Sequence, residues 1–398
     1  MAARVLHRAA GLLLLGALVA LGGCISAGTV SHMITAPPNG GHPALYPGRL
    51  GKIAREFYTE RFKVTAGPPP ATLSAAIIAP RDYHFQATDK PGDQPGTRVT
   101  GWKVGTAPTG KTDIKRMSAS KVQRKLEQLR QSLSKLPYCA PAGTVIILPG
   151  WGTAKERRLG SALDFANRGY RVVLVDLRGQ GDSSGKYITY GLVEHEDVTQ
   201  LITALEARGL VSGKLALFGI SEGAVTALDT AAEDPRVDSV IAVEPFTSFK
   251  TAIRGVGTDF APLLSDLISN GKLDKALQLA DKRTHLNLAD TDPLPRVRHI
   301  HVPVLYIAGG ADDIAPAAGV KALAQATPHA RFVELPRYTH MDSALAVGRV
   351  APIAVKALQE TLGKSTDETC LENPAEAPGK DAYEFTVTIR YRLGGKTH

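Results

Sequence analysis

Short apolar runs alternate with segments of helical spacing along most of the second half of the chain. The runs contain few polar positions, which is typical of strands that are buried on both faces of a sheet. They lie at 144–148, 171–175, 214–218, 240–243, 304–308 and 331–335. Buried strands that alternate with helices form a mostly parallel sheet covered on both sides. The pattern therefore predicts an α/β fold.

Two further segments stand out from this alternation. Residues 247–298 separate two predicted strands and contain helical pieces at Phe260–Ser269 and Leu273–Lys282. An insertion of this length is uncommon without a function, which predicts a lid. A second helix, at about 118–136, has a narrow apolar stripe and a basic opposite face. It predicts either a helix packed at the domain edge with a solvated face, or a contact with anionic lipid or a partner.

The two ends of the chain follow other patterns. Residues 24–70 are rich in Gly and Pro, which predicts a tether with one short helix around Ile53–Phe62. Tyr83–Ala87 and Thr97–Val104 follow as two strands joined by a turn. In the C-terminal extension, 366–398, apolar and polar residues alternate between Tyr383 and Leu393. This alternation predicts one extra strand at a sheet edge.

The N-terminus has the pattern of an export signal. Arg4 and Arg8 precede an uncharged apolar run that ends in Leu21-Gly22-Gly23-Cys24. The run is short for a membrane span, so 1–23 are predicted to be a signal peptide. Its end resembles the lipobox of bacterial lipoproteins, which implies lipidation of Cys24 and a membrane-anchored protein in the cell envelope. Ile25 after the cysteine implies the outer membrane, facing the periplasm, in a Gram-negative host. An ordinary signal with a chance cysteine is the alternative.

Charge and the other cysteines add two expectations. The formal net charge of +9 is concentrated in 111–136, so the chain has a local basic patch, and no nucleic-acid partner is predicted. Cys139 and Cys370 are expected to form a disulfide in an oxidising compartment, with two unrelated thiols as the alternative. The oligomeric state is left open.

A serine between a strand and a helix indicates nucleophilic catalysis. Gly219-Ile220-Ser221-Glu222-Gly223 matches G-x-S-x-G directly after an apolar run and before a helix. The motif also occurs at Gly181–Gly185, but that copy follows a Gly-rich loop with no helix after it. We therefore predict Ser221 as the nucleophile, and Ser183 and Ser184 as loop residues.

The partners of this serine are expected further along, in the order Ser, acid, His. Asp312 and His340 each follow a predicted strand, at the sheet edge where such folds place their sites. Asp313, one residue on, and Glu244, after the preceding strand, are alternative acids. Asp342 is expected to be a solvated loop carboxylate rather than a partner of the site. Four further histidines are expected at the surface or in the lid: His285, His299, His301 and His329.

From about Leu73 to Lys364 the chain resembles the α/β-hydrolases, close to the serine-aminopeptidase-like and esterase branches. The resemblance rests on G-x-x-D-x-x-x-P at 309–316, D-x-R-G-x-G-x-S-x-G at 176–185 and Gly101-Trp102 in the early hairpin. It implies a mostly parallel eight-stranded sheet in a domain spanning 71–365. It also implies that the early hairpin supplies the first two strands.

The oxyanion of an acyl-transfer reaction needs two backbone donors, and the amides of Trp151 and Glu222 are the candidates. No metal spacing or phosphate-binding loop is present, so no cofactor or metal is predicted. The expected function is a serine hydrolase acting on a small or lipid-like carboxylic ester or thioester. A peptidase with the same triad, and a non-catalytic envelope binding protein, are the alternatives.

Overall fold

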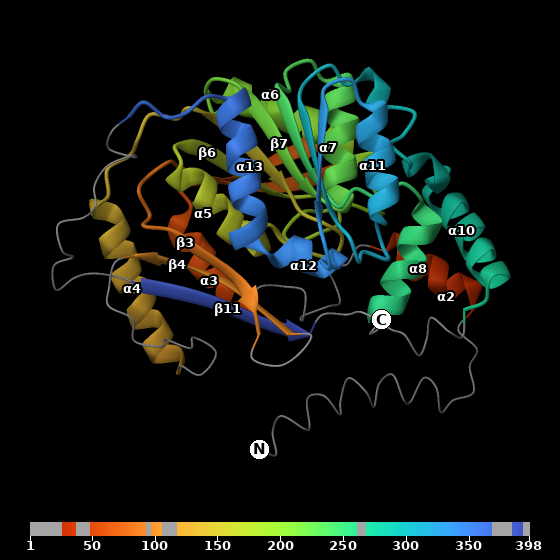
Figure 1. Ribbon diagram of the computed structural model, residues 1–398, viewed down its shortest axis with the longest axis horizontal. Coiled ribbons are helices and arrows are strands. Elements are labelled where there is room, and N and C mark those ends of the chain that lie inside the picture. The colour runs from red at the N-terminus through yellow and green to blue at the C-terminus, as the bar shows by residue number, and fades with distance from the viewer. Residues whose placement is uncertain are drawn as a thin grey trace.

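The computed structural model describes residues 26–36, 48–92, 97–105, 118–260, 268–367 and 384–392. Its centre is a twisted eight-stranded sheet in the order β1-β2-β6-β5-β7-β8-β9-β10 (Figure 1). β1 pairs antiparallel with β2, β2 pairs antiparallel with β6, and all later pairs are parallel. The strands are β1 (Glu60–Ala66), β2 (Ala71–Ile78), β5 (Gly143–Leu148), β6 (Tyr170–Asp176), β7 (Leu215–Ile220), β8 (Ser239–Val243), β9 (Val304–Gly309) and β10 (Ala330–Leu335).

This order, in which β2 alone runs antiparallel to its neighbours and the chain crosses over at β6-β5-β7, defines the architecture. The fold is that of the α/β-hydrolases. The inner strands β5, β7, β8 and β9 are buried throughout, as their unbroken apolar sequences require.

Helices cover both faces of the sheet and bury two large apolar clusters against it. One face carries α3 (Gly48–Phe57), α4 (Ala119–Lys135), α5 (Leu159–Asn167) and α13 (Val347–Thr361). The other carries α6 (Glu194–Ala207), α7 (Glu222–Glu233) and α11 (Ala317–Ala326). The predicted α/β sheet with helices on both faces is thereby confirmed.

The first two strands are not those expected. The predicted hairpin at 83–104 becomes β3 (Gln86–Pro91) and β4 (Thr97–Gly105), which lie outside the main sheet. They form a separate three-stranded sheet with β11 (Glu384–Arg392), the predicted C-terminal strand. The main sheet instead begins with β1, whose charged residues alternate with buried ones because it is an edge strand.

The expected tether at 24–70 is also wrong for its described part. It contains α2 (Ala27–Thr35), α3 and β1, and most apolar side chains of all three are buried or half-buried, Met33 being an exposed exception. Pro68–Pro70, which suggested a linker, forms the tight turn between β1 and β2. Proline fixes backbone geometry in turns as well as in linkers, so composition alone did not separate the two.

The lid insertion folds as helices beside α2 (Figure 1). It comprises α8 (Phe249–Phe260), α10 (Asn270–Thr284) and the short 3₁₀ turns Leu288–Thr291 and Val297–His299. The helical piece expected at Phe260–Ser269 lies mostly outside the described residues. A third apolar cluster joins the lid, α2 and the segment around Tyr190.

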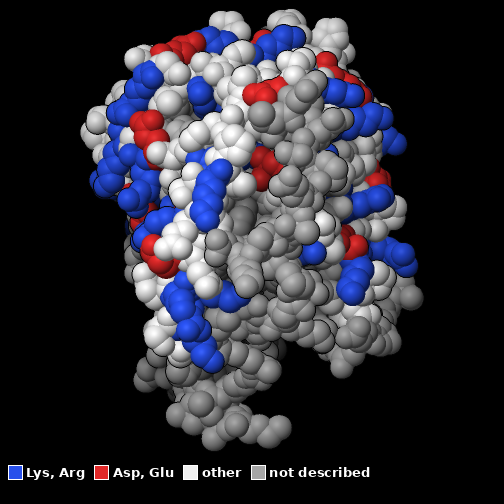
Figure 2. Space-filling model, turned by 90° about the vertical axis from the view of Figure 1, so that its left-hand side faces the viewer, with Lys and Arg blue, Asp and Glu red and all other residues white. Residues whose placement is uncertain are grey.

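The basic helix α4 buries its apolar stripe in the core and exposes its basic face. Figure 2 shows the side of the molecule on which α4 lies, with blue Lys and Arg side chains more frequent than red acidic ones. Arg130 on this face bonds Glu56 and Glu127. The packed-helix interpretation is confirmed, and contact with lipid stays a prediction.

Cys139, in the loop between α4 and β5, is disulfide-bonded. Cys24 and Cys370 both lie outside the described residues, so the partner stays a prediction. The amide of Ala140 donates to Asp367 at 2.8 Å, which brings the chain to within three residues of Cys370. This contact favours the Cys139–Cys370 pairing.

Candidate active site

Ser221 stands at the tight turn from β7 into α7. Its backbone has φ 55° and ψ −117°, a conformation that L-residues adopt at a cost and that is concentrated at functional sites. The turn requires glycine on both sides. A Cβ on Gly219 would lie 2.1 Å from the carbonyl oxygen of Gly223, and one on Gly223 would lie 2.2 Å from that of Leu148. The G-x-S-x-G spacing therefore follows from the packing of this turn.

His340 joins the other two members of a catalytic triad. Its Nε2 lies 2.9 Å from Ser221 Oγ, and its Nδ1 lies 2.7 Å from Asp312 Oδ2. Asp312 is buried, and its other oxygen accepts hydrogen bonds from the amides of Ile314 and Ala315. With both of its oxygens engaged, the carboxylate fixes the orientation of the imidazole. The structure thus brings together the three residues predicted from the sequence.

The two alternative acids differ from Asp312 in place and charge. Asp313 is exposed to solvent, whereas Glu244 is fully buried at the end of β8 with φ 54°. Glu244, Asp312 and His340 each place a possible ligand atom within 4.8 Å of the others. Burial and the adjacent charge of Asp312 raise the pKa of Glu244 well above its usual range. Burial also acts to raise the pKa of Asp312, but the hydrogen bond and charge of His340 outweigh it and hold that pKa below its usual value. Asp312 is therefore the ionised acid.

The segment that carries His340 is fixed at its start. His340 begins α12 (His340–Leu345), and Thr339 and Asp342 cap this helix with a reciprocal capping box. Asp342 is fully buried, so the expectation of a solvated loop carboxylate is wrong. The reason is that the loop ends in a helix, whose first amide groups need an acceptor.

The second sheet supports the same segment from outside. Tyr338 donates its hydroxyl proton to Asp89 on β3, and Arg98 Nη1 on β4 donates to the Tyr338 oxygen at 2.9 Å. The Arg98 guanidinium also stacks over the Tyr338 ring at 4.0 Å. Because β11 pairs with β4, the C-terminal strand contributes to a platform beside the catalytic histidine.

The two residues expected to donate to an oxyanion, Trp151 and Glu222, both lie beside the nucleophile in the sequence or the fold. Glu222 is the first residue of α7, so its amide is among those that a helix leaves without an internal acceptor. The Pro-Gly-Trp-Gly turn follows β5, and a Cβ on Gly150 would lie 3.3 Å from Ser221 Cβ. This contact places the turn that carries Trp151 against the nucleophile. The Glu222 side chain is buried and accepts a hydrogen bond from Gln180 at 3.0 Å.

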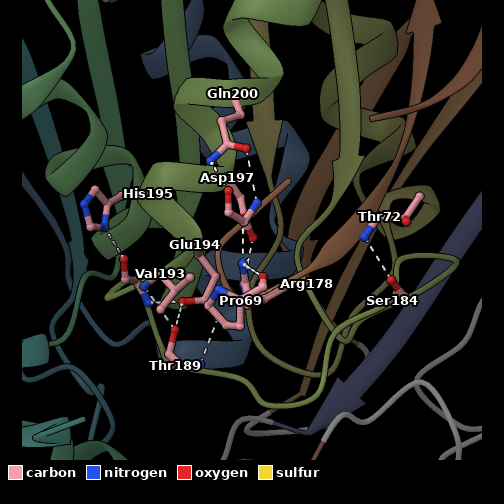
Figure 3. A network of polar contacts seen from close by, with 12 residues as sticks. Pro69, Thr72, Arg178, Ser184, Thr189, Val193, Glu194, His195, Asp197 and Gln200 are labelled. Carbon is pink, nitrogen blue, oxygen red and sulfur yellow. Dashed lines mark hydrogen bonds and ion pairs between the residues drawn. The ribbon is translucent and has the colours of Figure 1, made fainter. Parts of the chain in front are cut away.

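The second G-x-S-x-G copy is structural, as predicted. Ser183 is buried and donates to the carbonyl of Asp176, while Ser184 Oγ accepts from the amide of Thr72. Arg178 in the same loop makes a two-point ion pair with Asp197 at 2.6 and 2.7 Å and donates to the Pro69 carbonyl (Figure 3). These contacts hold the loop, and with it Gln180, against the β1–β2 turn.

An apolar cavity of about 180 Å³ opens beside Ser221. Among the described residues that line it, Glu222 is the only one with an ionisable acidic or basic side chain other than Tyr190, and the rest of the lining is mostly aliphatic and aromatic. The lining residues are Val30, Met33, Ile34, Trp151, Tyr190, Ser221, Glu222, Phe246, Phe249, Ala252, Ile253, Val256, Gly257, Ile268 and Ile314. The sequence predicted a lid here, but neither the aromatic residues nor α2. The Ser26 N-cap, followed by Val30, Met33 and Ile34 at helical spacing, is the signal that could have indicated α2.

In the described part of the chain, only Glu244, Asp312 and His340 come together as three possible metal ligands. Both ring nitrogens of His340 already bond other triad members. The ring nitrogens of His340 are therefore already used within the triad. The four histidines expected at the surface are all exposed: His285, His299, His301 and His329.

Known proteins are similar to parts of this chain. A profile of the S15 family, X-Pro dipeptidyl-peptidase, matches residues 113–284. The uncharacterized protein Rv2307c of Mycobacterium tuberculosis is 29% identical over 223 residues, which cover 55% of this chain and 71% of that protein. The α/β-hydrolase domain-containing protein WAV2 of Arabidopsis thaliana is 29% identical over 188 residues, covering 45% of this chain and 57% of WAV2. These matches, together with the sheet order and the triad, support a hydrolase of the α/β-hydrolase superfamily.

Solved structures of similar shape include two esterases. Esterase Pf2001 of Pyrococcus furiosus aligns with a TM-score of 0.45 at 18% identity, covering 71% of this chain and 95% of that one. A thermophilic esterase from Thermogutta terrifontis aligns with a TM-score of 0.45 at 15% identity, covering 76% and 99%.

Proposed function

We propose that the protein is a serine hydrolase that cleaves a carboxylic ester or thioester through an acyl-enzyme. The observation that carries the proposal is His340, whose two ring nitrogens connect Ser221 to the buried, ionised Asp312. The apolar lining of the adjoining cavity supports an acyl chain as the group held next to the nucleophile.

In the first half-reaction, Ser221 Oγ attacks the carbonyl carbon while His340 Nε2 takes the hydroxyl proton. The amides of Trp151 and Glu222 donate to the oxyanion of the tetrahedral intermediate. His340 then gives the proton to the leaving alcohol or thiol as the bond to it breaks. In the second half-reaction a water molecule, deprotonated by His340, attacks the acyl-enzyme and releases the carboxylic acid and Ser221.

Labelling with a fluorophosphonate probe tests the proposal, together with hydrolysis of p-nitrophenyl butyrate. We expect the wild-type protein to be labelled and active, and Ser221→Ala to lose the label and at least about 10³-fold in kcat. Ser183→Ala is the matched control, because it alters the serine of the second motif copy. A folded wild-type protein that takes no label would favour the non-catalytic binding protein.

A peptidase with the same triad is the second candidate, and the S15 match over 113–284 favours it. A dipeptidyl-peptidase must bind a charged amino terminus, whereas Glu222 is the only carboxylic acid among the described residues that line the cavity. Burial raises the pKa of Glu222 well above its usual range, so it is a neutral acid and a weak partner for a cation. Matched ester and X-Pro amide substrates separate the two candidates. Faster turnover of the amide would overturn the ester assignment.

We also infer that the protein is exported and anchored in a membrane through lipidated Cys24. The lipobox-like sequence Leu21-Gly22-Gly23-Cys24 supports this. Among the described residues, no helix is long and apolar enough to cross a bilayer. Metabolic labelling with a radioactive fatty acid should mark the wild-type protein and not Cys24→Ala, which should move to the soluble fraction. Membrane retention of the unlabelled variant would contradict the anchor.

A further inference from the structure

We propose that α2 forms the outer wall of the acyl cavity and sets the longest acyl chain that the enzyme accepts. The proposal rests on the proposed ester hydrolysis and adds the determinant of its chain-length specificity. The residues that carry it are Val30, Met33 and Ile34, which lie at helical spacing and all line the cavity.

The wall is assembled from distant parts of the chain. Val30 and Ile34 are buried in the same apolar cluster as Phe246, Phe249 and Ala252, near the start of the lid. Met33 also lines the cavity, yet 61% of it is exposed, so it stands at the rim. Without α2, these lid side chains would face solvent instead of an enclosed cavity. The position of α2 thus decides how deep the cavity is.

Polar contacts with two other segments hold α2 in place. The Tyr190 hydroxyl donates to the carbonyl of Ile34 at 2.6 Å, and the amide of Ile188 donates to that of Thr35 at 3.2 Å. Arg283, at the end of α10, donates to Thr35 Oγ1 at 3.3 Å and lies 2.8 Å from His32 Nδ1. These bonds cluster at the C-terminal end of α2. The N-terminal end rests on its apolar face and its Ser26 cap.

The residues beside Tyr190 are held by a hydrogen-bond network at the start of α6, in which Figure 3 shows Thr189 and Glu194. Glu194 accepts hydrogen bonds from the amides of Thr189 and Gly191, the residues on either side of Tyr190, at 2.9 and 2.8 Å. It also accepts from the Thr189 hydroxyl at 2.6 Å. The Tyr190 ring packs edge-on against Phe249 with centroids 4.6 Å apart. One rigid turn therefore supports both α2 and the lid at the cavity.

The size of the cavity limits the chain length. Its volume is about 180 Å³, and Met33 stands at its rim, so the space can hold an acyl chain of only limited length. A longer chain must displace the rim at Met33.

The test compares the kcat/KM of p-nitrophenyl decanoate with that of the butyrate ester in purified full-length variants. Met33→Ala opens the rim, and we expect the decanoate-to-butyrate ratio to rise about tenfold, the effect of a methylene-sized change in a hydrophobic pocket. Met33→Trp covers the rim and should lower the ratio by a similar factor. Tyr190→Phe removes the bond to Ile34 and should shift the ratio in the same direction as Met33→Ala.

Gly28→Ala is the matched control, because it adds a methyl group to an exposed position of α2 where the cavity is not lined. Its ratio should equal that of the wild type. Circular dichroism is to check that each variant folds, and Met33 is exposed enough for both of its substitutions to be tolerated. Unchanged ratios in folded, butyrate-active Met33 variants would overturn the role of α2. Absence of butyrate hydrolysis and of fluorophosphonate labelling in the wild type would instead overturn the proposed function, and this inference with it.

Discussion

Asp312 and Glu244 place two buried carboxyl groups side by side next to His340, and Asp312 alone bonds the imidazole. The pKa values of the two acids shift in opposite directions. Burial and the charge of Asp312 raise the pKa of Glu244, while the hydrogen bond from His340 holds the pKa of Asp312 below its usual value. The site therefore contains two acids but only one negative charge, which Asp312 carries.

The first prediction concerns the roles of these acids in catalysis. Asp312→Asn should lower kcat by about 10³- to 10⁴-fold, because the imidazole loses the acceptor that orients it and stabilises its protonated form. Glu244→Gln keeps a neutral side chain of the same shape and should lower kcat less than about tenfold. Steady-state hydrolysis of the butyrate ester measures both. A larger loss in Glu244→Gln than in Asp312→Asn would reverse the assignment of the triad acid.

The second prediction concerns stability and pH. A raised pKa in the folded state means that Glu244 keeps its proton above pH 4.3, the ordinary pKa at which the unfolded chain releases it. Its contribution to stability is therefore fully present below that pH and is lost as the pH rises, by up to about 1.4 kcal/mol per unit. Glu244→Gln should gain stability relative to wild type between pH 5 and pH 7.

Urea unfolding at pH 5, 6 and 7 measures this difference. Glu196→Gln, at an exposed glutamate, is the matched control and should run parallel to the wild type. Parallel curves for Glu244→Gln and wild type would show that Glu244 is already ionised in the folded protein.

A third prediction separates a buried ion pair from an exposed one. Arg178 and Asp197 are both 1% exposed, so removal of one partner leaves an unpaired buried charge. Arg178→Met should lower the free energy of unfolding by about 3–5 kcal/mol. Arg208→Met breaks an exposed pair with Glu60 and should cost less than about 1 kcal/mol. Equal losses in urea unfolding would contradict a buried charge pair at Arg178.

The fourth prediction compares two glycines with left-handed backbones. A Cβ on Gly181 (φ 50°) would lie 2.2 Å from Cγ of Asp176, whose carboxylate is held by the Lys155 ammonium at 2.6 Å. Gly209 (φ 65°) has open space at the same point. Gly209→Ala should lower the free energy of unfolding by about 1–2 kcal/mol, because alanine is strained in a left-handed backbone. Gly181→Ala should cost at least about 2 kcal/mol more in thermal or urea unfolding, because the buried pair must move. Similar losses of unfolding free energy in the two variants would mean that the loop around Gly181 rearranges without disturbing the Asp176–Lys155 pair.

The fifth prediction concerns the disulfide of Cys139. Peptide mapping without reductant should find Cys139 linked to Cys370, and Cys370→Ser should lower the free energy of unfolding by about 2–4 kcal/mol. A Cys24–Cys139 peptide would refute this pairing and the lipidation of Cys24 together.

The triad was predictable because its three residues follow strands, and the carboxyl ends of neighbouring parallel strands meet at one edge. The strand pattern, the G-x-S-x-G motif and the order Ser, acid, His together indicated Ser221, Asp312 and His340, with Asp313 and Glu244 left open as acids. The early strands were not predictable in the same way. β1 carries Arg61, Lys63 and Thr65 on its solvent side, so it has no apolar run, and the proline-rich turn after it resembles a linker.

The cavity could be predicted only in part. The length of the insertion indicates a lid, but the side chains that line the cavity come from α2, from the Tyr190 turn and from α8, far apart in the sequence. No local sequence pattern predicts the hydrogen bond from the Tyr190 hydroxyl to the carbonyl of Ile34. The protonation state of Glu244 could not be predicted from the sequence either. Its pKa depends on burial and on the charge of Asp312, which follows another strand.

The short distance between Cys24 and α2 has a consequence for how substrate reaches Ser221. Ser26 caps α2 only two residues after Cys24, and two extended residues reach about 7 Å. If the proposed acyl chains on Cys24 enter a leaflet, the start of α2 at Ser26 lies close to the lipid headgroups, which extend about 5–8 Å beyond the hydrocarbon. An enzyme anchored in this way would meet a lipid-like substrate at the membrane surface. Its rate would then follow the mole fraction of substrate in the surface, and not the concentration in bulk water.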